Sequence, residues 1–312
     1  MLTLQVAARI DEAQGIAGLV LTDPQGLPLP RWEPGAHIDV HIDRPGDAAL
    51  VRQYSLCGDP GDEAAYRIAV LREEDGDGSI HIHDRVRQGQ LVRVSEPRSL
   101  FRYAVRPRMV FVAGGIGITP LLPMIAAADA AGSDWELHYA GREPEGMAFG
   151  GHLEQYGDRV RVYVGSQGQR MAVPRIVAGA GDAVIYACGP SRLLDALEAE
   201  AESAGVELVV ERFVNDAVVT SEDDHPFEVE LSVTGRTITV NPGESILDKV
   251  VAAGIPAPSS CRGGTCGTCE TFVLEGQPDH RDAVLNARER EESEVMMICV
   301  SRCRGDRLVL EL

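Results

Sequence analysis

The chain has 312 residues, of which 44% are hydrophobic and 25% charged, and its formal net charge is −19 at pH 7. This length exceeds one ordinary core and predicts two or three domains, while the charge disfavours nucleic acid or anionic lipid and favours a partner protein with a basic patch. No apolar run approaches the ~20 residues that span a bilayer, and residues 1–15 lack the features of a secretion signal, so we expect a cytoplasmic protein.

The pattern of apolar and turn-forming residues changes twice along the chain, which predicts a multidomain fold. Residues 1–105 carry short β-type runs separated by Gly, Pro and Asp, as in an antiparallel β-barrel or sandwich. In residues 106–220, apolar strands alternate with Ala-rich helices, which indicates a parallel sheet with crossover helices. The acidic stretch 219–226 suits a linker, and residues 226–312 are predicted to form a mostly β module with one or two helices.

In the first segment we expect strands at four runs and one short helix: 2–10, 37–42, 66–71, 91–95 and, for the helix, about 79–86. Between these runs, residues 52–55 read Arg-Gln-Tyr-Ser and resemble the motif of ferredoxin-reductase-type flavin domains. Arg52 can neutralise a flavin phosphate, Tyr54 can pack on the ring system, and Ser55 can hydrogen-bond near the N5 atom. An ordinary exposed strand end is the alternative for so short a motif.

A glycine-containing turn, Gly76-Asp77-Gly78-Ser79, precedes the expected helix. Ser79 is predicted to be the N-cap, and the backbone amides of Gly78 and Ser79 can hold a phosphate. A surface turn is the alternative. Gly78 and Ser79 therefore join the four motif residues Arg52, Gln53, Tyr54 and Ser55 as candidate cofactor-binding residues.

In the second segment, a glycine turn follows the apolar strand 109–113 and opens a helix. Such a turn can bind a pyrophosphate through backbone amides and the helix dipole, although a generic connecting turn is the alternative. The candidate nucleotide-binding residues in this turn are Gly114, Gly115, Gly117, Thr119 and Pro120.

A second turn, Cys188-Gly189-Pro190, follows the strand at 183–185 and opens another helix. At the carboxyl end of a parallel strand, this turn is expected to reach the nicotinamide at the switch point of the sheet. We place Ser55 and Cys188 near the hydride path. A small thiol is tolerable there, whereas a buried packing cysteine is the alternative.

The third segment is expected to begin with a β-hairpin, 227–233 and 236–240, and a short helix at 245–254. Three of the chain's seven cysteines, Cys261, Cys266 and Cys269, then lie in one short loop, and Cys299 follows at a distance. This spacing matches the plant-type 2Fe-2S pattern, in which three thiolates of one loop and a distant fourth hold the cluster. Glycines at 263, 264 and 267 permit a close approach of the backbone.

Two alternatives concern these metal ligands. A structural zinc site is disfavoured because zinc sites usually pair short Cys-x2-Cys units or add histidines, and His280 is the only histidine nearby. Cys303, four residues beyond Cys299, is a rival fourth ligand. We favour Cys299 because it occupies a strand-like position and because the family resemblance described next places the ligand there.

Five motifs in order resemble the phthalate dioxygenase reductase family, which includes vanillate demethylase and phenoxybenzoate dioxygenase reductases. The motifs cover nearly the whole chain and lie at 52–56, 114–120, 188–190, 261–269 and 279–282, the last reading Asp-His-Arg-Asp. The resemblance implies an FMN-binding β-barrel, an NAD-binding α/β domain and a β-grasp ferredoxin domain, in that order. It also implies an aromatic residue near the flavin, which we assign to Phe213, and a monomer.

NADH is the expected hydride donor. NADPH-dependent members of the wider superfamily place a serine and a basic residue at one strand end, whereas here Ser166 is followed by Gln167. The missing cation favours NADH, although Arg142 or Arg170 could substitute for it.

The leading hypothesis is an NADH-dependent reductase that passes electrons through FMN and a 2Fe-2S cluster to a Rieske-type oxygenase, an aromatic dioxygenase or O-demethylase. No side-chain acid or base is required for hydride transfer, so no catalytic triad is nominated. A cytochrome P450 is the alternative acceptor. A flavin and iron-sulfur redox sensor without turnover is the alternative of a different class.

Overall fold

The computed structural model describes residues 1–42, 50–74, 76–214, 221 and 223–312. The chain divides into two compact units, Met1–Phe213 and Val214–Leu312. None of the described helices combines the length and the apolar character needed to cross a bilayer. The expected domain boundaries at 105/106 and 220/226 stay predictions, and residue 220 and part of the expected linker lie outside the described residues.

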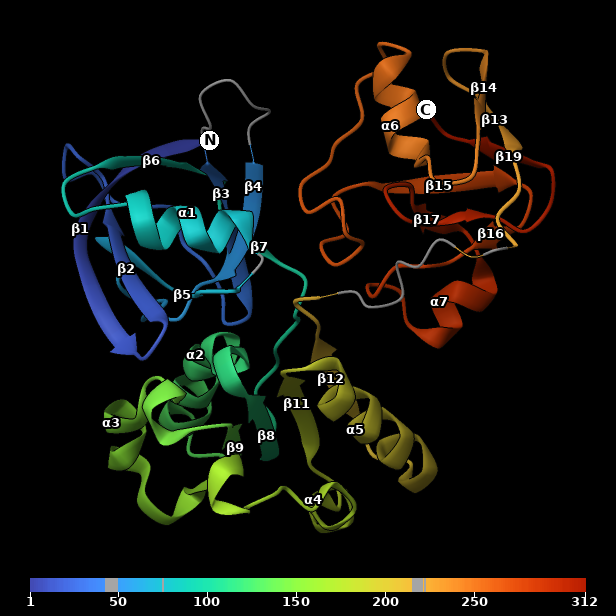
Figure 1. The fold of residues 1–312 in the computed structure, drawn as a ribbon. Coiled ribbons are helices and arrows are strands. Elements are labelled where there is room, and N and C mark those ends of the chain that lie inside the picture. Colours follow the sequence, from blue (N-terminus) through green and yellow to red (C-terminus); the bar gives the residue numbers. More distant parts are fainter. Residues whose placement is uncertain (43–49, 75, 215–220, 222) are drawn as a thin grey trace. The chain divides into compact units, whose positions relative to one another are not determined.

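The first unit begins with a closed antiparallel sheet and one helix. Its elements are β1 (Leu2–Ala13), β2 (Ile16–Thr22), β3 (Ala36–Ile42), β4 (Leu50–Ser55), β5 (Ala65–Leu71), α1 (Asp77–Arg85), β6 (Leu91–Val94) and β7 (Arg98–Ser99). The strand order is β4-β3-β6-β1-β2-β5, with β7 paired to β3. The end strands β4 and β5 also pack against each other, so the sheet forms the expected barrel, and α1 packs on both of them (Figure 1).

Alternation of side chains explains why these residues form a barrel. Ile38, Val40 and Ile42 of β3 are buried, as are Tyr66 and Ile68 of β5. Since successive side chains of a strand point to opposite faces, residues two apart fill the barrel core together.

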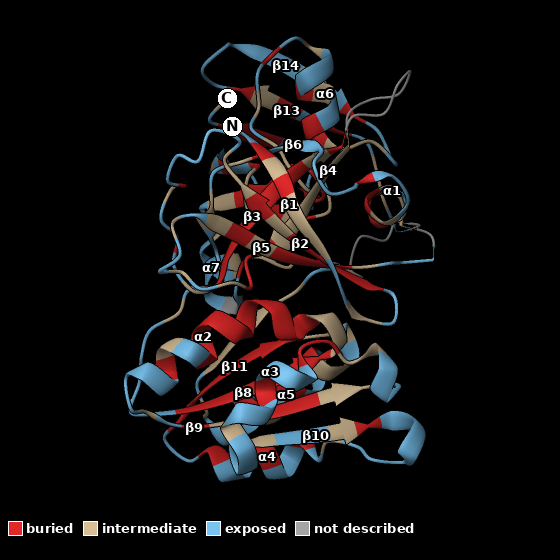
Figure 2. Ribbon diagram, turned by 90° about the vertical axis from the view of Figure 1, so that its left-hand side faces the viewer, coloured by how far each residue is buried: buried red, intermediate tan, exposed pale blue. Residues whose placement is uncertain are grey.

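The rest of the first unit is a parallel sheet between helices. Its elements are β8 (Arg108–Gly114), α2 (Ile118–Ala130), β9 (Asp134–Gly141), α3 (Gly150–Leu153), β10 (Val160–Val164), α4 (Val173–Ala180), β11 (Val184–Cys188), α5 (Ser191–Ala204) and β12 (Leu208–Glu211). The order β10-β9-β8-β11-β12 is that of a doubly wound sheet. The core on one face contains α2, the other contains α4 and α5, and the central strands β8 and β11 between them are buried (Figure 2).

The barrel and the parallel sheet share one hydrophobic core. Ile16, Cys57 and Ala69 of the barrel belong to the same buried cluster as the α2 side of the sheet. The Arg67 guanidinium lies 5.3 Å from the centre of the Phe149 ring, which adds a cation–π contact between the two parts. This shared core makes Met1–Phe213 one compact unit.

The second unit has the expected ferredoxin-like arrangement. Its elements are β13 (Phe227–Leu231), β14 (Arg236–Val240), α6 (Ile246–Ala252), β15 (Glu270–Glu275), β16 (Pro278–Asp279), α7 (Ala287–Glu292), β17 (Val295–Met297), β18 (Arg302–Cys303) and β19 (Arg307–Leu310). The predicted hairpin is confirmed as β13 and β14, and the predicted helix as α6. The sheet order is β14-β13-β19-β15-β17, with β13 and β19 parallel.

Several local predictions need correction. Strands β2 and β4 and helix α4 were not among the expected elements. The helix expected at 79–86 begins at Asp77, so the N-cap is Gly76 and not Ser79. Ser79 lies in the first turn instead, where its hydroxyl donates to the Gly76 carbonyl at 3.0 Å and accepts the Glu73 amide at 3.0 Å.

Candidate functional site

The barrel brings Arg52 to the amino-terminal turn of α1. A Cβ atom on Gly78 would lie 2.6 Å from Arg52 Cγ, so only glycine lets the arginine stem cross this turn. The turn has no side-chain cap, and its amides and the guanidinium together make a surface suited to a phosphate. The Arg52 guanidinium and the free amides of this turn are therefore the kind of groups that fit a flavin phosphate, as the sequence predicts for Arg52 and Gly78.

The side chains of Gln53 and Tyr54, in the same Arg-Gln-Tyr-Ser motif, point to opposite faces of β4. Tyr54 is partly buried, and burial raises the pKa of its hydroxyl. Gln53 points to the opposite face of β4, where its side-chain amide donates to Asp39 Oδ1 at 3.1 Å and lies 3.2 Å from His37 Nε2. Gln53 thus belongs to a polar network on the outer face of the barrel and is not gathered with Arg52 and Tyr54.

The two nucleotide turns meet at the switch point of the sheet. A Cβ on Gly117 would lie 2.5 Å from the Cys188 carbonyl carbon and 2.8 Å from the Gly189 nitrogen. A Cβ on Gly114 would lie 2.5 Å from Cδ of Pro190. The absence of side chains at these glycines therefore lets the turn after β8 touch the turn after β11, as expected for adjacent central strands.

The backbone at Gly115 has a different role in this turn. Its φ is +55°, and no atom lies within 4 Å of a Cβ built there. Thr119 closes the turn behind it, since its hydroxyl donates to the Ile116 carbonyl at 2.9 Å, and Pro120 is buried in α2. Gly115 therefore presents open backbone at the start of α2, where a pyrophosphate can approach closely.

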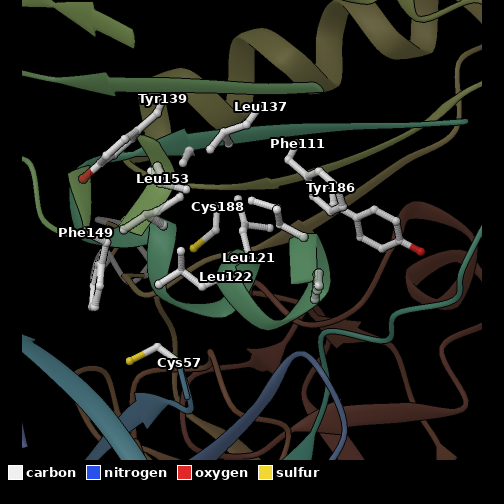
Figure 3. Close-up of a cluster of buried hydrophobic side chains, with 14 of the residues drawn as sticks. Cys57, Phe111, Leu121, Leu122, Leu137, Tyr139, Phe149, Leu153, Tyr186 and Cys188 are labelled. Atoms are coloured by element: carbon white, nitrogen blue, oxygen red, sulfur yellow. The ribbon is translucent and has the colours of Figure 1, made fainter. Parts of the chain in front are cut away.

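Cys188 is a packing residue. Its side chain is fully buried, and burial, together with the neighbouring Glu211, raises the pKa of the thiol. Figure 3 shows it in the core cluster that also contains Leu121 and Leu122 of α2. What Cys188 presents to the nucleotide turn is therefore its backbone, in agreement with the packing alternative.

Glu211 was not among the predicted site residues. It ends β12 directly beside Cys188 in the parallel register, and the Ser55 hydroxyl donates to its Oε2 at 3.4 Å. Burial raises the pKa of the Glu211 carboxyl to about 8, against the smaller opposing effect of the Ser55 hydrogen bond. Ser55 of the barrel, Cys188 and Glu211 thus converge, and the raised pKa favours the protonated form of Glu211 at neutral pH.

A raised carboxyl pKa makes stability depend on pH. The folded state binds more protons than the unfolded chain between about pH 4.5 and about pH 8, so stability falls as pH rises through this window. For the wild-type protein, we expect the free energy of unfolding in urea to be lower at pH 9 than at pH 6 by a Glu211 contribution on the order of 2 kcal/mol, a figure reduced for partial exposure. In Glu211→Gln this contribution is expected to be absent. The exposed Glu207→Gln is the control, and an unchanged pH profile in Glu211→Gln would contradict the assignment.

The second unit gathers the four cysteines predicted as metal ligands. Cys266, Cys269 and Cys299 are buried and Cys261 is partly buried. The pKa of Cys261 is lowered because the Cys266 and Cys299 thiols donate to its sulfur, and that of Cys269 is lowered because Cys299 donates to it. These contacts link the four sulfurs, and four cysteine sulfurs are the donor set of a 2Fe-2S cluster.

Backbone geometry in the loop supports this use. The amides of Gly263 and Thr265 donate to Cys261 Sγ at 3.3 and 3.4 Å, which stabilises negative charge on the sulfur. Gly264 and Gly267 have φ of +74° and +64°, as the predicted tight loop requires, whereas no close contact demands glycine at 263.

The two alternative metal ligands, Cys303 and His280, have other hydrogen-bond partners. Cys303 Sγ donates to the Arg307 carbonyl at 3.5 Å, and burial raises the pKa of its thiol. His280 Nε2 lies 3.4 Å from Ser293 Oγ. Cys299, by contrast, contacts the sulfurs of the loop, although it lies in a turn after β17 and not within the strand.

Phe213, the aromatic residue expected near the flavin, lies at the end of the first unit and is 40% exposed.

Comparison with known proteins covers the whole chain. The model of the 2Fe-2S iron-sulfur cluster binding domain matches residues 229–304. A toluene-4-sulfonate monooxygenase system reductase subunit from Comamonas testosteroni is 38% identical over 315 residues, 98% of each chain. The solved structure of phthalate dioxygenase reductase, described as modular for electron transfer from pyridine nucleotides to [2Fe-2S], shares 35% identity with a TM-score of 0.71 and covers 100% of this chain and 98% of that one.

A longer protein is also similar. The full-length cytochrome P450 from Tepidiphilus thermophilus shares 43% identity with a TM-score of 0.84, and the match covers 100% of this chain but 42% of that one. The resemblance inferred from the five motifs is confirmed by relatives that match from end to end. The chain therefore belongs to the family of oxygenase reductase subunits that includes phthalate dioxygenase reductase.

Proposed function

We propose that this protein is an NADH-dependent reductase that uses FMN and a 2Fe-2S cluster to supply electrons to a Rieske-type oxygenase. The observation that supports this most directly is the convergence of Ser55, Cys188 and Glu211. It joins the flavin side of the barrel to the switch point of the nucleotide sheet within one compact unit. Hydride transfer requires these two sites to be adjacent.

The side chains have separate tasks in this proposal. Arg52 and the first turn of α1 hold the flavin phosphate, and the backbone at Gly115 holds the nucleotide pyrophosphate. These groups, when bound, would supply hydride transfer at the nucleotide and flavin and one-electron transfer at the cluster. Ser55 and the protonated Glu211 would form a neutral pair, which leaves no carboxylate charge beside the Cys188 turn.

The choice of nucleotide rests on the turn after β10. Ser166 and Gln167 lie in this exposed turn, and the Ser166 amide donates to the Arg142 carbonyl at 2.9 Å. Gln167 offers no charge to a 2′-phosphate, which favours NADH. Arg142 is adjacent and exposed, so NADPH must be included as a competitor in every assay.

A cytochrome P450 is the second candidate acceptor. The specific observation is the 43% identity to part of a P450 chain, which is higher than the 38% shared with the sulfonate monooxygenase reductase subunit. Both acceptors require the same electron path within this chain. They differ only in the protein that docks at its end.

The test is anaerobic reduction of the purified full chain. NADH is expected to bleach flavin and iron-sulfur absorption and to support reduction of cytochrome c, with NADPH much slower. A protein without these bands, or one whose bands ignore both nucleotides, would contradict the proposal. Bleaching by NADH without reduction of any acceptor would favour the redox-sensor alternative. The isolated haem domain of the Tepidiphilus P450 and a purified vanillate demethylase oxygenase then separate the two partners by rate.

A further inference from the structure

The Asp-His-Arg-Asp motif at 279–282 has no role in the sites described so far. It starts in β16, where Asp279 pairs with Arg302 of β18, and it leads into the loop before α7. Its arginine and its second aspartate bind different parts of the second unit. These contacts indicate what the motif does.

Arg281 holds the segment that enters the second unit. Its Nη2 lies 2.6 Å from Asp224 Oδ1 and its Nη1 donates to Asp224 Oδ2 at 3.3 Å, so the guanidinium binds both carboxylate oxygens. Its Nε donates to Asp279 Oδ2 at 2.7 Å, which fixes the plane of the guanidinium. The Asp224 side chain is only 3% exposed, so this is a two-point contact at a shielded carboxylate, and removal of either partner would leave the other charge without its partner.

Arg302 strengthens the same attachment. Its Nε lies 3.5 Å from Asp224 Oδ1, and its Nη2 donates to the His225 carbonyl at 3.0 Å. Its guanidinium also lies 5.0 Å from the centre of the Phe227 ring at the start of β13. Two arginines of the ferredoxin body therefore hold residues 224–227.

The other side of the motif contacts the cluster loop. The Ala283 amide donates to the Gly264 carbonyl at 2.8 Å, within the loop that carries three of the cysteines. Asp282 is buried and accepts the Leu285 amide at 2.8 Å and the Ser301 hydroxyl at 3.4 Å. The Arg281 amide also donates to Ser301 Oγ, at 3.2 Å, and Ser301 is two residues beyond the ligand Cys299.

We propose that Arg281 is a positioning residue for electron transfer, because it ties the entering chain at Asp224 to the loop that holds the cluster. This inference rests on the proposed function, in which one electron leaves the reduced flavin and reduces one ferric iron of the cluster. With Arg281 in place, the cluster loop and the entry point of the chain move as one body. Without it, residues 224–226 are held by fewer contacts, and the cluster samples more orientations relative to the chain that enters the unit.

The test uses Arg281→Gln in the full-length loaded protein, followed by anaerobic stopped-flow after mixing with NADH. Flavin bleaching is expected at the wild-type rate, whereas cluster bleaching is expected to slow by about threefold or more. Cluster content and the electron paramagnetic resonance spectrum of the reduced cluster are expected to stay unchanged. The Asp224 amide is expected to exchange hydrogen at least about tenfold faster.

Three variants keep the result interpretable. Asp224→Asn removes the same charge pair from the other side and is expected to reproduce the effect, and Arg281→Lys is expected to restore only part of it because lysine lacks the two-point geometry. Arg288→Gln is the control, since Arg288 is exposed and pairs with Glu292 within α7.

A wild-type rate of cluster bleaching in both Arg281→Gln and Asp224→Asn would overturn the inference, as would loss of the cluster in both, which would make the contact merely structural. A wild-type protein that NADH does not bleach would instead contradict the proposed function.

Discussion

Cys299→Ser is expected to abolish the iron-sulfur absorption and the reduction of one-electron acceptors, while NADH still bleaches the flavin. The Cys299 sulfur contacts those of Cys261 and Cys269. A serine oxygen is a weaker ligand for the cluster iron than a cysteine thiolate. Flavin binding lies in the other compact unit and is expected to survive. Iron content, the visible spectrum and cytochrome c reduction measure the three parts of this result.

Cys303→Ser is the matched control because Cys303 is also a buried cysteine of the second unit. Its thiol donates to the Arg307 carbonyl, and a serine hydroxyl can do the same, so full iron content is expected. If Cys303→Ser lost the cluster and Cys299→Ser kept it, the two assignments would have to be exchanged.

Gly117→Ala is expected to destabilise the first unit and to weaken NADH binding by more than about tenfold. The added Cβ would meet the carbonyl group of Cys188 and the nitrogen of Gly189, which are backbone atoms that cannot rotate away. Separation of the two turns is expected to cost roughly 2–3 kcal/mol of stability. Urea unfolding and NADH titration of the same preparation provide the two measurements.

Gly179→Ala provides the comparison for this substitution. Gly179 lies in α4 with no atom within 4 Å of its Cβ position, and alanine is the better helix former. It is expected to leave NADH affinity unchanged and stability equal or slightly higher. An equally small effect of Gly117→Ala would show that the contact between the two turns is not required.

The sequence predicted the architecture because periodic patterns and turn chemistry are local. Alternating strands and helices between 106 and 220 led to a parallel sheet, and its handed crossovers place the turns after β8 and β11 side by side. The cysteine spacing likewise predicted a ligand set whose sulfurs the fold brings together. The cysteine at 188, in contrast, was ambiguous, and only its burial shows that the side chain packs in the core.

Long-range polar contacts could not be predicted in the same way. Glu211 is separated from Ser55 by 156 positions, and a single glutamate at a strand end is usually a solvated residue. Its place at the carboxyl end of the last parallel strand was the available signal. The start of α1 was missed because Gly76, with no side chain to signal a cap, begins the helix before Ser79.

The division into two units corresponds to the two kinds of particle that the proposed reaction moves. A hydride travels with its nucleus, so donor and acceptor atoms must approach to about 3–3.5 Å in a fixed orientation. The buried cluster of side chains shared by the barrel and the parallel sheet supplies that rigidity. A lone electron carries no nucleus and demands no such contact, so the ferredoxin unit can keep a core of its own. Evolution can accordingly exchange or refit the electron-carrying module for a new acceptor without disturbing the chemistry of the nucleotide.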